Sequence, residues 1–245
     1  MNPQDNLILS QLSQQAYQRF MTRLRLVSLN KREVLYESGS TLRTGVYFPV
    51  TAAISLLAHL PDGCVNELVS VNHEGMVVAG ACCGTLSFDR AQVRTAGLAY
   101  RMEVPEFMAA IRNDEATMFD LVLWSQRRVR RMAQSLSCIS HHSVEQRLAK
   151  YLLVDLDNTG VDTIECTHQE IADSLGVRRE SVSLILKHLE DEQAIQLRRG
   201  TIGVLNRQAL VDSVCECYEP PVKHALSQPA LRATFNQPSM SLAGA

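Results

Sequence analysis

The sequence of 245 residues lacks several features that would assign it to common protein classes. It has no run of the roughly 18 to 20 apolar residues that a membrane-spanning helix requires. Its polar start, MNPQDN, contains no basic segment followed by an apolar one, which is the pattern of a secretory signal peptide. We therefore expect a cytoplasmic protein with no membrane partner.

Cysteine is present, but not in the pattern of a disulfide framework. The seven cysteines are scattered along the chain, at positions 64, 82, 83, 138, 166, 215 and 217. An odd, scattered set is not expected to form structural disulfides in a reducing compartment. Free cysteine usually acts as a small buried apolar residue, and neither Cys82-Cys83 nor Cys215-x-Cys217 has the spacing of a metal-binding knuckle. Redox activity of either pair stays open.

Histidine and carboxylate residues also lack metal-binding spacing. The segment HHSVE offers His141, His142 and Glu145, but it does not have the two-histidine spacing of a zincin. At this helix junction we expect capping and hinge roles instead. His59 and His73 stand alone near turns and predict no metal site. The sequence therefore predicts no catalytic residue, no metal ion and no resident cofactor.

Positive charge is not in excess. The chain has 24 Lys and Arg residues against 26 Asp and Glu, a formal net charge of -2. Such a chain has no general attraction for nucleic-acid phosphate, so any DNA contact must come from a local patch. Apolar residues make up 46% of the sequence, which is enough for a core of ordinary size. The length allows two compact domains, or one large domain with appendages.

Hydrophobic periodicity changes along the first half of the chain. Residues 6–28 have apolar positions at helical spacing and predict a short helical lead-in. From Glu33 to Val104 apolar residues follow a period of two, and the turn segments ESGS, PDG, NHEG and CCGT fall between the runs. This alternation predicts a small closed antiparallel β-domain.

Helical spacing returns after Pro105 and continues to about His141. Within residues 114–140, seven positions recur by alternating steps of four and three, as in a coiled-coil seam. These positions are Met118, Val122, Ser125, Val129, Met132, Leu136 and Ile139. A long helix with one apolar stripe predicts a partner helix, and the simplest partner is a second copy of the chain. The alternative is a helix that packs on its own β-domain.

The segment THQEIADSLGVRRESVSLILKHLEDEQAI has the signals of two short helices. Thr167, followed three residues later by Glu170, is a capping box that starts a helix at residue 168, and Gly176 ends that helix. A second helix begins almost at once. Its predicted buried stripe consists of Val182, Ile185, Leu186 and Leu189. Two short helices joined by a tight glycine-containing turn predict a helix-turn-helix.

The outward face of the second helix has side chains that suit base edges. It carries Arg179, Glu180, Ser183, Leu184 and Lys187. Arginine can donate twice to guanine, glutamate can accept from the cytosine amino group, and an apolar side chain can touch the thymine methyl. The following segment, IQLRRGTIGVLN, predicts a β-hairpin whose Arg198 and Arg199 would meet phosphate. The alternative is a helix pair used only for packing.

This segment resembles the winged helix-turn-helix of the CRP/FNR superfamily of bacterial transcription regulators. The resemblance implies a homodimer that binds two-fold symmetric double-stranded DNA and contacts RNA polymerase. It gives base-reading positions to Arg179 and Glu180. It gives phosphate-contacting or supporting positions to Thr167, His168, Gln169, Arg178 and Ser181. Leu184 stands where family members usually place a second base-reading arginine, so the half-site is expected to differ from the family's consensus.

The β-domain departs further from the cyclic-nucleotide-binding members of that family. Those members carry a Gly-Glu pair for the ribose and an Arg-Ser or Arg-Ala pair for the cyclic phosphate. Here Gly75 is followed by Met76, and the arginine of Arg90-Ala91 appears one place late. The polar residues of the long helix that meet the base are replaced by Met132 and Ala133. We therefore expect a signal other than ordinary cyclic-AMP binding.

Two other functions remain as alternatives. A degenerate cyclic-nucleotide site could use Gly75, Met76, Arg90 and Ala91. An iron-sulfur cluster is not expected, because that branch of the family uses cysteines near the N-terminus and the first cysteine here is Cys64. From a different class, a metal-dependent enzyme could occupy the β-domain, but only His59 and His73 are available there as histidine ligands.

The sequence thus predicts an α+β chain with a cupin-like antiparallel β-roll, a long dimerisation helix and a C-terminal winged helix-turn-helix. We expect a β-roll sensor with flanking helices at 1–113 and a dimerisation helix with a hinge at 114–142. The DNA-binding domain is expected at 143–218 and a flexible tail at 219–245.

Overall fold

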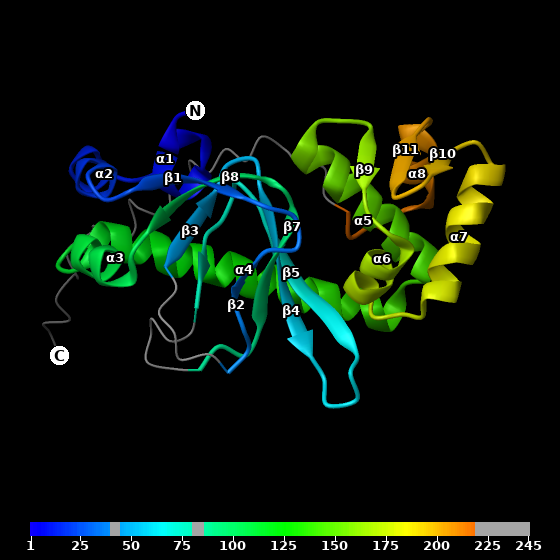
Figure 1. The fold of residues 1–245 in the computed structure, drawn as a ribbon, viewed down its shortest axis with the longest axis horizontal. Coiled ribbons are helices and arrows are strands. Elements are labelled where there is room, and N and C mark those ends of the chain that lie inside the picture. Colours follow the sequence, from blue (N-terminus) through cyan, green and yellow to red (C-terminus); the bar gives the residue numbers. More distant parts are fainter. Residues whose placement is uncertain (40–44, 80–85, 219–245) are drawn as a thin grey trace, which may run out of the picture.

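The computed structural model describes residues 1–39, 45–79 and 86–218. Figure 1 shows a β-structured half, flanked by short helices, and a mainly helical half that contains a small sheet. The long helix α4 (Glu115–His141) runs behind the sheets and reaches both halves. The predicted α+β class and the long helix are confirmed. The predicted tail at 219–245 and the Cys82-Cys83 pair lie outside the described residues.

The N-terminal segment is only partly helical. A short 3-10 turn, η1 (Pro3–Asp5), is followed by α1 (Leu7–Ser10) and α2 (Gln14–Met21). The prediction of helix up to residue 28 was wrong, because Arg25–Leu29 forms strand β1 and pairs antiparallel with β8. Strand pairing satisfies the backbone groups of this segment and buries Leu29, and this tertiary contact overrides the helical spacing.

The β-roll consists of two four-stranded antiparallel sheets. One sheet has the order β1 (Arg25–Leu29), β8 (Gly97–Met102), β3 (Val46–Pro49), β6 (Val77–Val78). The other has the order β2 (Val34–Tyr36), β7 (Arg90–Thr95), β4 (Ala53–His59), β5 (Val65–Val71). Ile54, Leu56 and Val93 are fully or almost fully buried in the core of this roll. The strands predicted from the period of two therefore form the roll, together with short strands that the alternation did not indicate.

A second apolar cluster fills the space between the roll and its helices. Phe20 from α2, Phe48 from β3 and Phe107 from α3 (Val104–Ile111) lie with ring centroids 6.0 to 6.3 Å apart. Asn113, with a φ of 61°, separates α3 from α4. The side chain of Asp114 then caps α4 by accepting a hydrogen bond from the Thr117 backbone amide.

Helix α4 packs on the β-roll with one face and leaves another face bare. Leu121 and Trp124 join the cluster around the phenylalanines, and Met132 packs against the core of the roll. Five of the seven predicted seam residues remain exposed large apolar side chains: Met118, Val122, Val129, Leu136 and Ile139. The helix therefore packs on its own β-domain with one face, and most of the predicted seam stays exposed on another. Among the described residues, no helix combines the length and apolarity needed to cross a membrane.

The C-terminal half of the described chain is built around one apolar core. It comprises α5 (Val144–Thr159), β9 (Thr163–Glu165), α6 (His168–Leu175), α7 (Arg179–Asp191), β10 (Ile195–Arg198), β11 (Thr201–Val204) and α8 (Arg207–Ser213). Leu148 and Leu152 of α5, Ile171 of α6 and Leu186 of α7 are fully buried together. The three strands form a sheet with the order β10-β11-β9. This is the predicted winged helix-turn-helix.

Charged side chains join the β-roll to this C-terminal domain. The Arg94 guanidinium of β7 lies 2.7 Å from the Asp155 carboxylate of α5 and 3.7 Å from the Glu67 carboxylate of β5. It also stacks over the ring of Tyr151, 4.0 Å from the centroid. All three charged side chains are largely buried. Burial alone would lower the pKa of Arg94, but Tyr151, Asp155 and Glu67 more than offset this and raise it.

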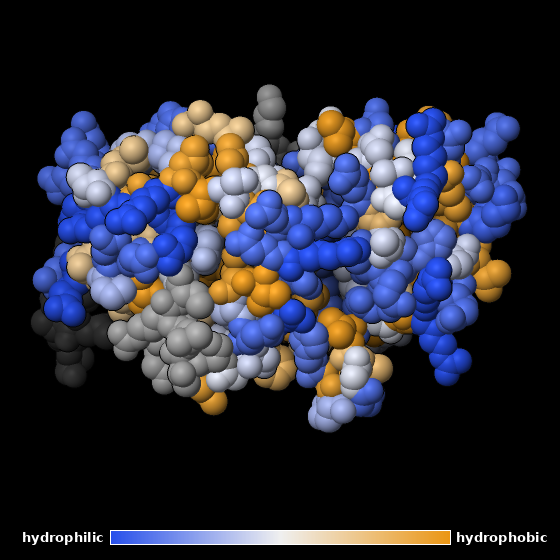
Figure 2. Space-filling view, viewed as in Figure 1, coloured by the Kyte–Doolittle hydropathy of each residue, from blue (hydrophilic) through white to orange (hydrophobic). Residues whose placement is uncertain are grey.

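A second set of contacts joins the turn before β2 to the start of α6. The Arg32 Nε atom lies 2.9 Å from the Glu170 carboxylate, and the Lys31 ammonium lies 3.8 Å from the same carboxylate. We call these two sets together the charged junction: Lys31, Arg32, Glu67, Arg94, Tyr151, Asp155 and Glu170. Figure 2 shows hydrophilic residues along this boundary between the two halves.

Candidate DNA-binding surface

Helix α6 begins and ends with the local signals that the sequence contains. The Glu170 backbone amide donates to the Thr167 hydroxyl at 3.2 Å, and the Thr167 amide donates to the Glu170 carboxylate at 2.8 Å. These reciprocal hydrogen bonds are the predicted capping box. Gly176 ends the helix at a φ of 64°, a left-handed conformation that glycine adopts without strain. The chain then enters α7 after two residues, which fixes the tight turn.

Helix α7 presents a polar face because its apolar face is used for packing. Val182, Leu186 and Leu189 are buried in the domain core. Arg179 and Glu180 lie exposed in the first turn, and Leu184 is 73% exposed one turn later. A leucine exposed to this extent gains nothing from the domain core. The exposed face is therefore free for contact with another molecule.

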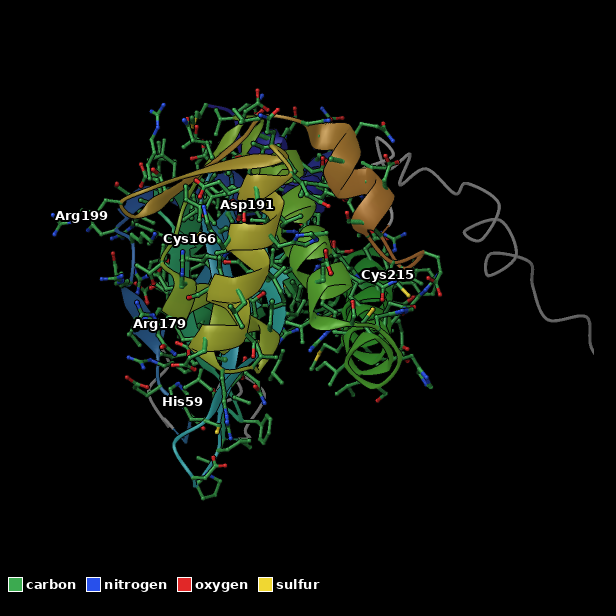
Figure 3. All side chains as sticks on the ribbon, turned by 90° about the vertical axis from the view of Figure 1, so that its right-hand side faces the viewer. His59, Cys166, Arg179, Asp191, Arg199 and Cys215 are labelled. Carbon is green, nitrogen blue, oxygen red and sulfur yellow. The ribbon has the colours of Figure 1, made fainter. Side chains whose placement is uncertain are left out.

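Four charged side chains around the start of α7 and the hairpin tip have no internal partner. Arg178, Arg179, Glu180 and Arg199 form no side-chain hydrogen bond or ion pair with any residue in the three described ranges. Figure 3 shows Arg179 and Arg199 along the same side of the domain. Unpaired arginines on one edge give a local positive surface in a chain whose net charge is negative.

An open hollow of about 430 Å³ lies between the start of α6, the start of α7 and the hairpin. It is lined by Cys166, Thr167, His168, Gln169, Arg179, Arg198, Arg199, Gly200, Thr201 and Ile202. The backbone amides at a helix N-terminus and arginine side chains both favour an anion, so this hollow suits a phosphate group. The fold thus brings six of the predicted DNA-contacting residues to one place.

Two of the other predicted contact residues, Ser183 and Lys187, are engaged within the domain. The Ser183 hydroxyl donates to the Arg179 carbonyl at 3.0 Å and lies 2.8 Å from His168 Nδ1. The Lys187 ammonium lies 3.1 and 3.0 Å from the Glu190 and Asp191 carboxylates. Hydrogen bonds to Asp191 and Glu190 raise the pKa of Lys187. Its charge is therefore partly neutralised before any DNA arrives.

Two further predicted phosphate contacts also have internal partners. Gln169 Nε2 donates to the Asp173 carboxylate at 2.7 Å, and Arg198 Nη2 donates to the Gln196 side chain at 2.9 Å. These exposed hydrogen bonds are weak in water and leave other donor atoms available. Ser181 is half-buried, with its amide donating to the Arg178 carbonyl.

Thr201 is a residue of the hollow for which the sequence predicts no role. Thr201 pairs with Arg198 across the hairpin and lines the same hollow. A threonine in a strand is too common to be a signal on its own. The register of the hairpin, which only the structure gives, shows that this residue adjoins the two wing arginines.

The residues expected at a degenerate effector site are mainly packed against apolar side chains. Met76 and Ala91 are buried in two different apolar clusters. A Cβ atom on Gly75 would lie 2.7 Å from Val71 Cγ1 and 3.2 Å from Trp124 Nε1, so the close approach of α4 requires glycine. Ala133, which stands where the resemblance places a base-contacting polar residue, is exposed.

Arg90 is paired with a carboxylate. Its Nε atom lies 3.3 Å from the Glu37 carboxylate. The neighbouring residue, Asp89, accepts a hydrogen bond from the Tyr36 hydroxyl at 3.0 Å and lies 3.8 Å from the Arg128 guanidinium. The Glu37 carboxylate beside the arginine opposes the binding of a cyclic phosphate.

The buried cysteines differ in their surroundings. Burial raises the pKa of Cys166 to about 12, as expected for an inert apolar cysteine. Cys217 is different, because it lies beside Cys138 and Cys215. Burial and these neighbouring thiols raise the pKa of Cys217 to about 11. Spacing along the sequence gave no reason to expect a metal site here, but the fold brings these cysteines and His142 into one group.

Comparisons with known proteins agree with this architecture. Residues 146–213 match the family of Crp-like helix-turn-helix domains. No curated protein sequence matches the chain. Among solved structures, a CRP/FNR-family putative transcriptional regulator from Eubacterium rectale is similar with a TM-score of 0.68 at 17% identity. The similarity covers 84% of this chain and 96% of that one.

Two further solved structures have the same fold. A CRP-family transcriptional regulator from Thermus thermophilus has a TM-score of 0.67 at 22% identity, with 79% of this chain and 99% of that chain covered. FixK2 from Bradyrhizobium japonicum has a TM-score of 0.64 at 18% identity, with 78% and 98% covered. The β-roll, the long helix and the helix-turn-helix therefore occur here in the arrangement seen in those proteins.

Proposed function

Residues 146–213 are a Crp-like helix-turn-helix domain on a chain with the CRP/FNR regulator fold, and from this premise we propose a homodimeric, sequence-specific DNA-binding transcription regulator. The observation that carries the proposal is the edge formed by the unpaired Arg178, Arg179, Glu180 and Arg199 beside the hollow. Side chains left unpaired on one edge of a compact domain are available for a charged partner. DNA fits this edge because its three arginines can donate to phosphate oxygens or base edges and its one glutamate can accept from a base amino group.

Arg179 and Glu180 read bases in this proposal. They occupy the first turn of α7, which is the end of the recognition helix that enters the major groove. Leu184 adds an apolar contact, for example to a thymine methyl, where another regulator of this type would place an arginine. Ser183 supports this face through its hydrogen bonds to Arg179 and His168 rather than by contact with a base.

Phosphate contacts fix the position of the domain on the duplex. His168 and Gln169 offer their amides at the start of α6, beside Thr167, whose own amide is engaged by Glu170. Arg198 and Arg199 line the same hollow from the wing. Arg178 and Ser181 flank this region at the start of α7, and Lys187 is reached only after exchange of its carboxylate partners. Such contacts give affinity and orientation but carry no sequence information.

A homodimer through α4 supports two-fold symmetric binding. The exposed apolar stripe of Met118, Val122, Val129, Leu136 and Ile139 has coiled-coil spacing on a helix of 27 residues. Ser125 belongs to the same spacing, between Val122 and Val129. A stripe of this length exposed to water favours pairing with a second copy.

The signal received by the β-roll is not ordinary cyclic AMP in this proposal. The Glu37 carboxylate that pairs with Arg90 supports this view. An enzyme on the β-roll is less well supported: within the described ranges, the one group of three or more potential metal ligands lies outside the roll. Contact with RNA polymerase remains a prediction from the resemblance, and a cytoplasmic location remains a prediction from the sequence.

Selection of bound sequences from random double-stranded DNA, followed by gel-shift titration, tests the base-reading role. Arg179→Ala should weaken binding to the selected site by about 1–3 kcal/mol and relax the preference at one base pair of each half-site. Arg25→Ala, an exposed arginine on β1 in the other half of the chain, is the matched control and should bind as the wild type does. A wild-type protein that selects no sequence at moderate salt would refute the proposal.

Sedimentation analysis tests the dimer independently of DNA. Leu136→Glu places a charge in the exposed stripe and should shift the protein from dimer to monomer at micromolar concentration. Ser137→Glu, on the neighbouring exposed position, is the control and should leave the dimer intact. A wild-type protein that sediments as a monomer, or a Leu136→Glu variant that sediments as a dimer, contradicts the proposed interface.

A further inference from the structure

Three cysteines and one histidine from distant parts of the sequence meet where α4 ends. Cys138 lies in the last turn of α4, and His142 is the residue that caps this helix. Cys215 and Cys217 follow α8, at the other end of the C-terminal domain. The one potential ligand atom of each residue lies within 4.8 Å of the other three. We call this group the sulfur cluster.

The local structure holds each pair of ligands in place. Cys138 and His142 are four residues apart, and the His142 amide donates to the Cys138 carbonyl at 3.0 Å, so both side chains leave the same face of the helix end. The segment with Cys215 and Cys217 ends in a turn closed by the Tyr218 amide. The Tyr218 hydroxyl is anchored 2.7 Å from Asp157, which pins this segment to α5.

The spacing of the ligand atoms fits a single tetrahedral ion. With a metal-sulfur distance of about 2.3 Å, tetrahedral geometry places two sulfurs about 3.8 Å apart and a nitrogen about 3.5 Å from a sulfur. His142 Nε2 lies 3.4 Å from Cys217 Sγ, and no pair in the cluster exceeds 4.8 Å. A contraction of at most about 1 Å between sulfurs and about 1.3 Å between the nitrogen and a sulfur would therefore complete the coordination shell. A polynuclear iron-sulfur cluster needs its ligands much farther apart.

The surroundings of the sulfur cluster suit a charged metal-thiolate centre. Three thiolates around a divalent ion leave one net negative charge. The Lys150 ammonium lies 3.6 Å from Cys138 Sγ, and Gln134 Nε2 lies 2.9 Å from Cys217 Sγ, so two donors already point at the sulfurs. Cys138 and Cys215 are almost fully buried, which keeps water from competing as a ligand. The Glu216 carboxylate lies 3.7 Å from His142 Nε2 on the exposed side.

We propose that Cys138, His142, Cys215 and Cys217 bind one zinc-class transition-metal ion that joins the end of α4 to the end of the DNA-binding domain. Three cysteines and one histidine are a ligand set of structural zinc sites. The two ligand pairs enclose the whole DNA-binding domain between them in the sequence. The bound ion therefore fixes this domain relative to the helix proposed to form the dimer, a role that goes beyond the DNA-binding function proposed above.

Metal content measured on the full-length protein tests the proposal without any DNA. Protein loaded with Zn²⁺ and desalted under reducing conditions should retain one zinc ion per chain. Elemental mass spectrometry measures this content. The Cys215→Ser/Cys217→Ser variant should lose this ion, whereas Cys64→Ser, at an exposed cysteine in a hairpin of the β-roll, should retain it. A wild-type protein that retains no more metal than the double variant overturns the proposal.

Cobalt substitution gives a second test that does not depend on a variant that folds. Co²⁺ bound by three thiolates and an imidazole should give the intense visible bands of a tetrahedral thiolate site, and Zn²⁺ should displace them at one equivalent. Only the weak bands of octahedral Co²⁺, or a thiol titration that finds these cysteines oxidised in protein prepared under argon, would exclude the site.

Three variants separate metal ligation from packing. His142→Cys keeps a ligand at this position and should retain the metal with a red-shifted cobalt spectrum, whereas His142→Ala should lose it. Lys150→Met removes only an outer donor and should weaken metal affinity by about 10-fold to 100-fold. Equal metal content in His142→Cys and His142→Ala would contradict a ligand role for His142.

Discussion

The C-terminal domain is joined to the rest of the chain at two places. One consists of ion pairs within the chain, and the other is a group of potential metal ligands. At the charged junction, Arg94 is matched by the Asp155 and Glu67 carboxylates, and Arg32 by the Glu170 carboxylate. At the sulfur cluster, four metal-ligating groups face one another, and the nearest cation is the Lys150 ammonium beside Cys138. Figure 3 shows Cys215 on the side of the domain away from Arg179 and Arg199.

The two connections differ in whether they need a component from outside the chain. The charged junction contains its own counterions, and the raised pKa of Arg94 means that its guanidinium stays charged at every accessible pH. The sulfur cluster contains ligands for an ion that must come from outside the chain. One connection is therefore permanent, while the other depends on metal supply. The domain is thus held to the β-roll whatever the metal supply, and bound metal would change only how firmly its end is joined to α4.

The largest effect is expected from breaking the charged junction at its centre. Arg94→Met would leave the Glu67 and Asp155 carboxylates buried without a cation, which should lower the free energy of unfolding by about 3–5 kcal/mol. Urea denaturation followed by circular dichroism measures this loss. Arg25→Met, at an exposed position without an ion pair, should change stability by less than about 0.5 kcal/mol.

A compensating variant sharpens the Arg94 result. When Arg94→Met is combined with Glu67→Gln and Asp155→Asn, no buried charge is left unpaired, so much of the lost stability should return. If Arg94→Met alone costs less than about 1 kcal/mol, the three groups are not coupled as the distances indicate.

A smaller loss of stability is expected at Gly176, where the helix-turn-helix packs against β5 of the other half. Gly176 and Gly160 both have left-handed backbones, with φ of 64° and 69°, so alanine at either position should cost about 1–2 kcal/mol. At Gly176 the added Cβ would also lie 2.5 Å from the Asn66 side-chain oxygen of β5, whereas at Gly160 it meets nothing within 4 Å. Thermal unfolding should therefore show the larger loss for Gly176→Ala.

The excess loss at Gly176 should disappear when Asn66 is truncated. Asn66 can rotate away in part, so this excess is expected to be about 1 kcal/mol, and Asn66→Ala should remove it. Gly160→Ala should be unaffected by Asn66→Ala, because it lies outside the contact. Equal losses at the two glycines would mean that β5 and the helix-turn-helix do not pack in solution as they do here.

The helix-turn-helix could be predicted from sequence because its signals are local. The Thr167-Glu170 cap, the Gly176 turn and the spacing of the α7 stripe each lie within a few residues of one another. The helical spacing of residues 6–28 was misleading at its end, because pairing with the distant β8 made Arg25–Leu29 a strand.

Neither connection between the two halves could be predicted from sequence, because its members are far apart in the chain. The one signal for the charged junction was Asp155, a carboxylate on a buried helix face between Leu152 and Leu156. Such a residue requires a buried cation, but nothing in the sequence identifies Arg94 as that cation. The sulfur cluster had the weaker signal of two cysteine-containing segments whose approach only the fold supplies.

The smallest effect is expected at the exposed edge of the charged junction. Arg32 is largely exposed, so Arg32→Ala should cost no more than about 1 kcal/mol at neutral pH and low salt. Partial burial would raise the pKa of Glu170, but the Thr167 backbone amide, Arg32 and Lys31 together lower it below its ordinary value. A carboxylate with a lowered pKa stabilises the fold above its unfolded pKa of about 4.3, and this contribution is lost as the pH falls through the folded pKa.

The difference between wild type and Arg32→Ala should therefore vanish as Glu170 is protonated, and it should also shrink as salt is added. Urea denaturation measured from neutral pH to below about pH 4 tests this. Arg23→Ala is the control, because the Arg23 side chain donates to the Arg19 carbonyl, which does not titrate, so any loss there should be independent of pH. If the difference in unfolding free energy between wild type and Arg32→Ala persists at low pH, Arg32 stabilises the junction by packing. The Arg32–Glu170 contact would then differ from the buried contacts of Arg94, which are ion pairs.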